Sequence, residues 1–224
     1  MRHSKGDTSE IDRTGYRNLA DAAKKNKIPR FVLVSILACD KADRVPHFYN
    51  KYRVEQYLEK IRQPFISLRA GAFLDQSRDF IAPKLKKGVL PSFVPGIANG
   101  MIYTPDLAQY IAQAAKSLPE KELNQVVSVG WSEPVTPKRL AKAFSKVLGK
   151  PINPKPAFPR IVTAVGLPIF ARFSEMVSDM YEMIKWVKTG QYIDKNTAPQ
   201  ERLFGKVPTP EDVARSYSEA IGLI

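Results

Sequence analysis

The chain has 224 residues, 44% hydrophobic and 25% charged, which is the composition of a folded globular protein rather than a disordered one. Thirty-five basic residues against 22 acidic ones give a formal net charge of +13. The single cysteine, Cys39, excludes an internal disulfide and a multi-cysteine zinc site, so we expect no metal centre and a reducing, cytoplasmic location. No apolar run reaches the roughly 18 residues of a membrane span, and we expect neither a span nor secretion.

The positive charge raises the question of whether nucleic acid or an anionic surface is a partner. The basic residues are scattered, as in AAKKNK, PKLKKG and PKRLAKAFSK, with no run of five. Lysines also favour the C-terminal ends of helices. We therefore predict an ordinary solvated basic surface, and keep an anionic-surface or nucleic-acid binder as the less favoured alternative.

The first half of the sequence alternates helical and strand patterns. Residues 12–27 are alanine-rich with helical periodicity, and Asp12 is suited to cap that helix. Residues 30–38 and 64–73 are apolar runs typical of strands covered on both faces, and a helix is predicted between them at residues 45–61. Strand, helix and strand in this order form a βαβ unit, so we expect a parallel sheet.

The second half is more broken. We expect a helix near residues 75–88, short irregular strands in the Pro/Gly-rich residues 89–103, and helices after Thr104-Pro105 and Thr136-Pro137. A third strand is predicted at 124–130, an extended proline-rich segment at 150–160, an apolar helical segment at 161–188 that packs against the core or lines a pocket, and a capped helix at the end. Residues 1–90 would form the distal part of a sheet domain. Residues 91–224 would form a smaller, mainly helical lobe, with a strand and helices returning to the core.

The helix at 45–61 carries an unexpected lysine. His47, Lys51, Val54, Leu58 and Ile61 share one stripe at helical spacing, although three of the five are core residues. A lysine on such a stripe faces a partner in a crevice, or it is solvated and pairs with Glu55 one turn later.

The glycines do not form a phosphate-binding loop. None of the twelve lies in a GxGxxG or P-loop pattern, so the phosphate cradle of a dinucleotide fold is missing from this sequence. In contrast, Ser35, Lys51 and LRAGAF at 68–73 would meet at the carboxyl edge of the sheet, where parallel α/β folds bind ligands.

Residues 15–76, from GYRNLADAAKKNKIPRF to RAGAFLDQ, resemble the middle of an NmrA-like, atypical short-chain dehydrogenase/reductase. TPDLAQYIAQAA and EPVTPKRLAKAFSKVLGKPI resemble the substrate side of the same family, so about two thirds of the chain is covered. The resemblance implies an α/β fold, here a partial Rossmann-like parallel sheet (the distal half), and a site for NAD or NADP that is weak or incomplete in this chain.

The resemblance also implies roles for residues. Lys51 takes the position of a lysine that binds the nicotinamide ribose and lowers the pKa of a tyrosine four residues earlier, which protonates the substrate. That position holds His47 here, and Tyr49 lies two residues from Lys51, so His47 and Tyr49 are alternative proton donors, or His47 is only a cap. The residues implied to contact the cofactor are Ser35, Ile36, Lys51, Gly71, Ala72 and Phe73.

Two residues have alternative interpretations, and the sequence departs from the family pattern at its start. Ser35 could be a plain strand-end hydroxyl, and Arg69 could be a structural ion-pair partner. Some 60 to 80 residues of a complete member, at about 30 residues per βαβ unit, would precede Met1, so we expect a truncated chain or one that needs a protein partner for the absent part. The implied function is NAD(P)-dependent oxidoreduction of a small carbonyl or quinone-like compound, with a non-catalytic dinucleotide sensor as the alternative.

Overall fold

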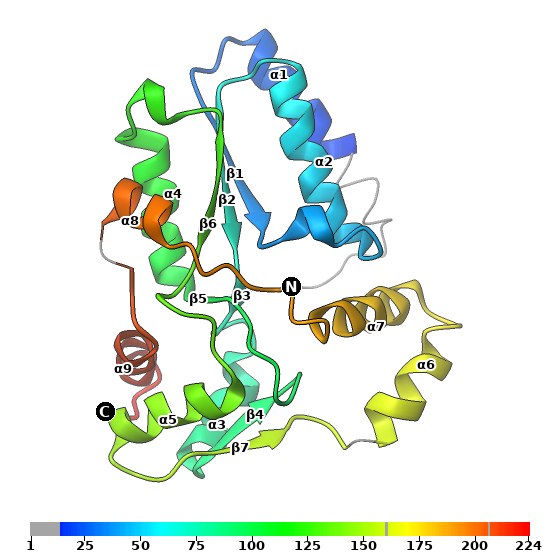
Figure 1. Cartoon of the computed structure of the whole chain (residues 1–224), viewed down its shortest axis with the longest axis vertical. Helices are drawn as coiled ribbons and strands as arrows, with labels where there is room; N and C mark the ends of the chain where they lie inside the picture. The colour runs from blue at the N-terminus through cyan, green and yellow to red at the C-terminus, as the bar shows by residue number, and fades with distance from the viewer. Residues whose placement is uncertain (1–13, 160, 206) are drawn as a thin grey trace.

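A three-stranded parallel sheet forms the upper half of the molecule in the computed structural model (Figure 1). The structure describes residues 14–159, 161–205 and 207–224, so the expected helix cap Asp12 lies outside the described residues. The strand order is β1-β2-β6, and both pairings are parallel, with Phe31 opposite Phe65 and Ile66 opposite Gln125. The predicted βαβ unit is confirmed. The strands are β1 (Phe31–Ile36), β2 (Phe65–Ala70) and β6 (Gln125–Val129).

Helices cover both faces of this sheet because alternate strand residues point to opposite sides. Leu33 and Phe65 pack with α1 (Tyr16–Lys25) and α2 (Pro46–Lys60), whereas Ile66 and Leu68 pack with α4 (Thr104–Lys116). Figure 1 shows α1 and α2 on one side and α4 on the other, with α8 (Ala198–Phe204) beside β6. The helix α8 was not predicted, because seven residues give too short a pattern to recognise.

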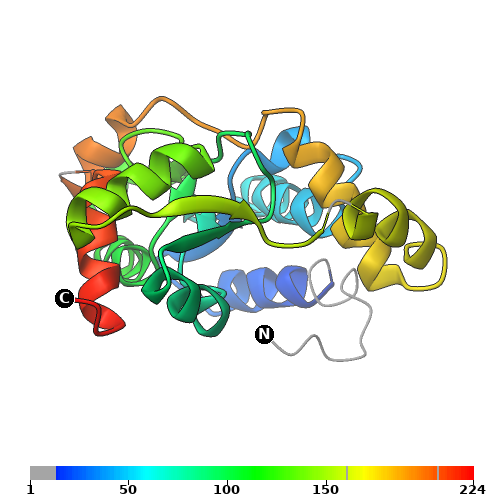
Figure 2. The same cartoon turned by 90° about the horizontal axis from the view of Figure 1, so that it is seen from below.

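The lower half has its own hydrophobic core. Phe144 and Tyr217 are fully buried there, together with side chains from α3 and β4. The proline-rich segment predicted as extended forms an edge strand, β7, which pairs in parallel with β4, and Figure 2 shows these two strands from below. The elements are α3 (Arg78–Lys86), β4 (Val89–Ser92), α5 (Pro137–Leu148), β7 (Asn153–Pro156) and α9 (Pro210–Ala220).

Two very short strands connect the halves. β3 (Ala72–Phe73) continues from β2 and pairs in parallel with β5 (Met101–Ile102), which leads into α4. Because β6 and α4 belong to the upper half, the chain returns to the sheet after residue 90, as the sequence suggests. The domain boundary itself stays a prediction.

Helix starts follow the predicted capping residues in part. Thr136 accepts a hydrogen bond from the Arg139 N–H, and Thr209 and Asp212 form a reciprocal capping box at α9. Thr104 instead becomes the first helical residue of α4, and its hydroxyl donates to Asp75 at 2.8 Å. The loop after β3 therefore supplies the acceptor at this helix start.

The segment after β7 projects from the body of the molecule in Figures 1 and 2. It contains a π-helical turn η4 (Val162–Gly166), α6 (Leu167–Phe170) and α7 (Glu175–Val187). The predicted burial of this apolar segment holds only for its end, where Trp186 packs on Phe48 with ring centroids 5.5 Å apart. Phe173 is 82% exposed. The 3-10 helices η2 (Cys39–Lys41) and η3 (Glu120–Glu122) complete the described elements.

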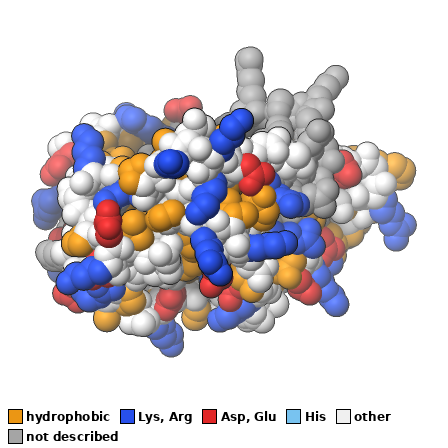
Figure 3. Space-filling model, turned by 90° about the horizontal axis from the view of Figure 1, so that it is seen from above, with side chains coloured by type: hydrophobic (Ala, Val, Ile, Leu, Met, Phe, Trp, Pro, Cys, Tyr) orange, Lys and Arg blue, Asp and Glu red, His pale blue; other side chains and the backbone are white. Residues whose placement is uncertain are grey.

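The surface at the upper end mixes charged and apolar groups. Figure 3 shows lysine and arginine side chains there, separated by acidic and hydrophobic ones. Among the described residues, no helix is both long and apolar enough to cross a membrane.

The lower core generates the first prediction. Phe144→Ala should lower the free energy of unfolding by about 3–5 kcal/mol, because Phe144 is fully buried and truncation leaves a cavity. Chemical denaturation measures the change. The matched control is Phe158→Ala, whose side chain is 49% exposed and which should change stability by less than about 0.5 kcal/mol. Equal losses for the two variants would contradict the packing described here.

Candidate functional site

The carboxyl ends of the three parallel strands meet near the middle of the molecule (Figure 1). Ser35 near the end of β1 lies opposite Arg69 of β2 and is 2% exposed. The segment that joins α7 to α8 crosses this edge, and its Tyr192 carbonyl accepts a hydrogen bond from the Gly100 N–H at 2.8 Å. The edge is therefore an internal surface between the halves, covered by residues from late in the sequence.

Gly71 is required by a close backbone approach at this edge. A Cβ atom at Gly71 would lie 2.6 Å from both the carbonyl carbon and the oxygen of Gly100, closer than real Cβ contacts. The next residue, Ala72, donates its N–H to the same Gly100 oxygen at 2.9 Å. The predicted cofactor wall of Gly71, Ala72 and Phe73 is thus a backbone strip paired with β5.

A buried ionic cluster lies beneath α2. Glu55, 4% exposed, accepts hydrogen bonds from Ser67 Oγ at 2.7 Å and from Arg69 Nε and Nη2 at 3.1 and 2.7 Å. The remaining end of the Arg69 guanidinium donates to Asp40 at 2.6 Å. Arg69 is therefore a structural ion-pair partner, the alternative that the sequence left open.

The cluster determines the charge state of its neighbours. Burial lowers the pKa of Arg69, but the hydrogen bonds and negative charge of Glu55 outweigh it and leave the pKa above its usual value. Burial, followed by the charge of Glu55, raises the pKa of Cys39 to about 11, and its Sγ lies 3.6 Å from Ser35 Oγ. The thiol is neutral at physiological pH, so Cys39 acts as a small buried hydrophobe rather than as a nucleophile.

Lys51 lies at the border of α2 rather than on its most buried face. The core-facing side chains of α2 include Phe48, Val54 and Leu58, while Lys51 is half-buried. Its Nζ lies 3.8 Å from the centroid of the Tyr16 ring on α1, a cation–π contact. The ammonium group is thus held between α1 and α2.

The two candidate proton donors have other neighbours. His47 Nδ1 is 3.0 Å from the Asp179 carboxylate on α7, and its ring meets Phe48 edge-on. Tyr49 packs along the surface of α2, with its ring centroid 5.6 Å from that of Tyr52. The observed contacts of His47, Tyr49 and Lys51 therefore lead to three separate neighbours, and their catalytic roles stay predictions.

A small pocket marks the carboxyl edge beneath the crossing segment. Its volume is about 20 Å³, and its lining includes Leu37, Gly100, Trp131 and Gln200. Gln200 fixes this corner, because its amide accepts from the Gly130 N–H and donates to the Gly130 carbonyl, both at 2.9 Å. The space suits a water molecule, whereas small-molecule pockets usually measure about 300 Å³ or more. The sequence did not reveal Gln200 because α8 was not recognised.

The described part of the chain contains no candidate metal-binding cluster. Within residues 14–159, 161–205 and 207–224, no group of three or more His, Cys, Asp or Glu side chains is arranged to hold a metal ion. The prediction of no metal centre stays a prediction for the whole chain.

The NmrA-like family model matches residues 9–214. The chain belongs to the NmrA-like family. Because the match covers most of the chain, the resemblance seen at residues 15–76 extends through the lower half as well. A comparison with curated proteins gives no match.

Solved structures of NAD(P)-binding proteins share this fold. A nucleoside-diphosphate-sugar epimerase from Staphylococcus aureus superposes with a TM-score of 0.71 at 15% identity, covering 95% of this chain and 74% of that one. An NADPH-dependent quinone oxidoreductase from Escherichia coli, complexed with NADPH, gives 0.68 at 16% identity, covering 90% and 70%. A triphenylmethane reductase from Citrobacter sp. gives 0.71 at 15% identity, covering 98% and 74%. At these identities the likeness establishes the Rossmann-type fold alone.

The ionic cluster generates the second prediction. Glu55→Gln should destabilise the fold by about 3 kcal/mol, because it removes the buried anion that pairs with Arg69. Urea denaturation measures the loss. As a control, Glu182→Gln breaks a pair with Lys185 that is largely solvent-accessible and should cost less than about 0.5 kcal/mol. A Glu55 variant as stable as the control would exclude the proposed importance of the cluster.

The buried thiol of Cys39 generates the third prediction. At pH 8 Cys39 should react with a thiol-specific reagent at least about tenfold more slowly in the native chain than in urea, because it is buried and its pKa is raised to about 11. Absorbance during labelling gives both rates. Similar native and denatured rates would show that the Cys39 site is open.

Proposed function

We propose that this chain is an NAD(P)-dependent oxidoreductase acting on a small carbonyl or quinone-like compound. The observation that carries the proposal is the parallel-sheet edge at which Ser35, the 71–73 strip and the end of β6 converge, since α/β folds bind ligands there. The family and the fold shared with the NADPH-bound quinone oxidoreductase support it. NAD and NADP remain equally compatible with the described residues.

The described residues fit one side of a dinucleotide better than the other. Lys51 would donate to a ribose hydroxyl after leaving the Tyr16 ring, and the Ser35 hydroxyl would do so once it is uncovered, because it is now buried beside Cys39. Ile36 and the 71–73 strip offer apolar and backbone contacts. In contrast, the sequence has no glycine-rich phosphate loop, and the pocket at the edge holds only about 20 Å³. Binding by the chain alone would therefore be weak and would need the crossing segment near Tyr192 to shift.

Each proposed residue has one task. A bound dinucleotide supplies or accepts hydride. Lys51 would orient the ribose, and His47 or Tyr49 would deliver the proton that the reduced carbonyl requires. For His47 this means exchanging its contact with Asp179 for the substrate, so substrate entry and the position of α7 would be coupled.

A protein partner could complete the cofactor site along β1. Phe31 and Leu37 donate their N–H groups to Pro64 and Ala70, so the alternate residues Val32, Val34 and Ile36 direct their backbone groups away from β2. Within the described part of the chain β1 is the end strand of its sheet. We propose that a partner chain adds a strand at this edge and supplies phosphate contacts, as the expectation of a shared site requires.

The lysine tests the proposal. Lys51→Ala should weaken NADPH binding about tenfold, because it removes a charged hydrogen-bond donor from the ribose side. Titration followed by NADPH fluorescence gives the affinity, and NADPH oxidation with a panel of quinones and aldehydes gives turnover. Lys60→Ala, at the far end of the same helix and exposed, is the matched control and should bind as the wild type does. Unchanged binding by the Lys51 variant would remove this residue from the site.

The alternative is a non-catalytic dinucleotide sensor. The contact between His47 Nδ1 and the Asp179 carboxylate favours it, since a candidate proton donor held by α7 is committed to a structural contact. NADPH binding that needs Lys51, without turnover of any quinone or aldehyde, would support the sensor. Turnover lost in both His47→Ala and Lys51→Ala would support the enzyme.

A further inference from the structure

The most apolar exposed surface of the described chain is an arm that projects from the lower half. Nine of the fourteen large hydrophobic side chains that are exposed lie between residues 158 and 180. We call residues 158–180, apart from Arg160, the apolar arm. Figures 1 and 2 show its helix α6 far from the sheet. The nine are Phe158, Ile161, Val162, Val165, Ile169, Phe170, Phe173, Met176 and Met180.

The arm is too exposed to be an ordinary surface. Phe173 is 82% exposed, Ile161 71% and Phe170 64%, and α6 packs mainly against its own neighbours η4 and α7. Soluble proteins rarely leave so many large apolar groups together in water, and such patches mark interaction sites. The arm therefore needs an apolar environment on its outer side.

The sequence around the arm is strongly basic. From Pro134 to Ser174 there is no aspartate or glutamate, and the eight basic residues are Lys138, Arg139, Lys142, Lys146, Lys150, Lys155, Arg160 and Arg172. Lys142, Lys146 and Lys155 are exposed on α5 and β7. In Figure 1 α5 lies on the left of the lower half and α6 on the right, and β7 leads from the core toward the arm. Arg139 is paired with Glu133 and Glu211, so the lysines supply the basic charge of this end.

The arm itself carries few charges. Its charged residues, Arg160 apart, are Arg172, Glu175 and Asp179. Asp179 contacts His47, and Glu175 lies in the first turn of α7, where the helix dipole stabilises a negative charge. The positive charge at this end of the molecule therefore comes from the neighbouring α5 and β7.

From these observations we infer that the apolar arm inserts into the interface of an anionic lipid bilayer, with the basic residues of α5 and β7 bound to its headgroups. Apolar insertion and electrostatic attraction together give stable peripheral attachment, and neither requires a helix that crosses the membrane. The inference does not depend on dinucleotide binding.

Other occupants match the surface less well. A second copy docked arm to arm would cover the apolar side chains but would leave Lys142, Lys146 and Lys155 without an anionic partner. Nucleic acid would satisfy the lysines but would leave Phe170 and Phe173 in water. A bilayer with anionic lipids accepts both kinds of side chain.

Vesicle flotation of the full chain tests the apolar part. The wild type should float with phosphatidylcholine vesicles containing about 30% phosphatidylserine and bind phosphatidylcholine alone at least about tenfold more weakly. Phe170→Ser/Phe173→Ser should reduce binding to the anionic vesicles at least about tenfold. The matched control is Leu19→Ser/Ile28→Ser, which removes two side chains that are also exposed (56% and 45%) but lie on the upper half, and it should bind as the wild type does.

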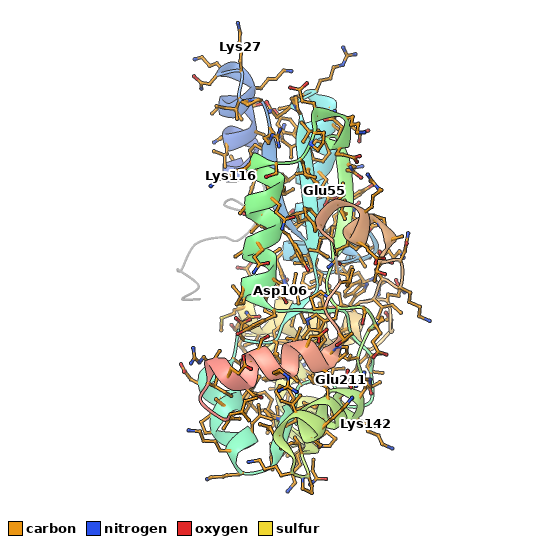
Figure 4. All side chains as sticks on the ribbon, turned by 90° about the vertical axis from the view of Figure 1, so that its left-hand side faces the viewer. Lys27, Glu55, Asp106, Lys116, Lys142 and Glu211 are labelled. Atoms are coloured by element: carbon orange, nitrogen blue, oxygen red, sulfur yellow. The ribbon has the colours of Figure 1, made fainter. Side chains whose placement is uncertain are left out.

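Two triple lysine variants test where on the surface the positive charge must lie. Lys142→Gln/Lys146→Gln/Lys155→Gln should weaken flotation with anionic vesicles by about tenfold or more, since each basic residue at the surface contributes to the attraction. Lys25→Gln/Lys27→Gln/Lys116→Gln removes the same net charge from the opposite end, where Figure 4 labels Lys27 and Lys116 away from Lys142. That control should lose no more than about threefold.

Insertion can be observed directly. Because Cys39 is buried, a fluorophore placed on Phe173→Cys labels the arm selectively, and its emission should shift to shorter wavelength when anionic vesicles are added. The inference is overturned if the wild type does not float, if the arm variants bind like their controls, or if the probe does not shift. It is also overturned if sedimentation velocity shows a dimer that the Phe170→Ser/Phe173→Ser variant does not form. A further contradicting result would be that the chain is retained on immobilised nucleic acid and anionic vesicles do not release it.

Discussion

The buried ion pair between Glu55 and Arg69 determines how helix α2 sits on the sheet. Its two hydrogen bonds, together with the one from Ser67 to Glu55, fasten the middle of α2 to β2, and Asp40 ties the same guanidinium to the turn after β1. A charge buried in this way is costly unless it is paired, so the helix can adopt few other rotations. The orientation of every side chain on α2, including each candidate site residue, follows from this constraint.

Much of the fold could be predicted from the sequence, because the strands at residues 31–36, 65–70 and 125–129 are short apolar runs and proline and threonine mark the starts of α5 and α9. The rotation of α2 about its own axis could not be predicted from the sequence. Its buried face includes Asn50 and Glu55, whereas the apolar pattern pointed to a stripe containing His47 and Lys51. A hydrophobic pattern cannot reveal a polar residue that is buried because its partner lies on a strand distant in sequence. The carboxyl edge follows from the predicted βαβ unit, but that it binds a ligand stays a prediction, and the side-chain contacts there depend on residues 179, 192 and 200, which carried no motif.

The position of the carboxyl edge in the sheet favours ligand access, whereas its observed packing restricts that access. A ligand at this edge, as we propose, would need an open surface, yet the Tyr192 carbonyl and the Gln200 side-chain amide cover it through hydrogen bonds to the backbone of Gly100 and Gly130. Tyr192 is buried, and burial raises the pKa of its hydroxyl well above the ordinary tyrosine value, so the hydroxyl is neutral. The connection between α7 and α8 therefore covers this edge, and helix α7 joins it to the projecting arm.

The contact between Gly71 and Gly100 has a mechanical consequence for the whole molecule. The chain at 100–101 passes between two other glycines, since a side chain at Gly130 would also meet the Met101 oxygen at 2.7 Å. Three backbone segments therefore touch without any layer of side chains that could repack and absorb a displacement. A displacement of the lower half would therefore be transmitted directly to the strand ends, and the two cores would move as one rigid body.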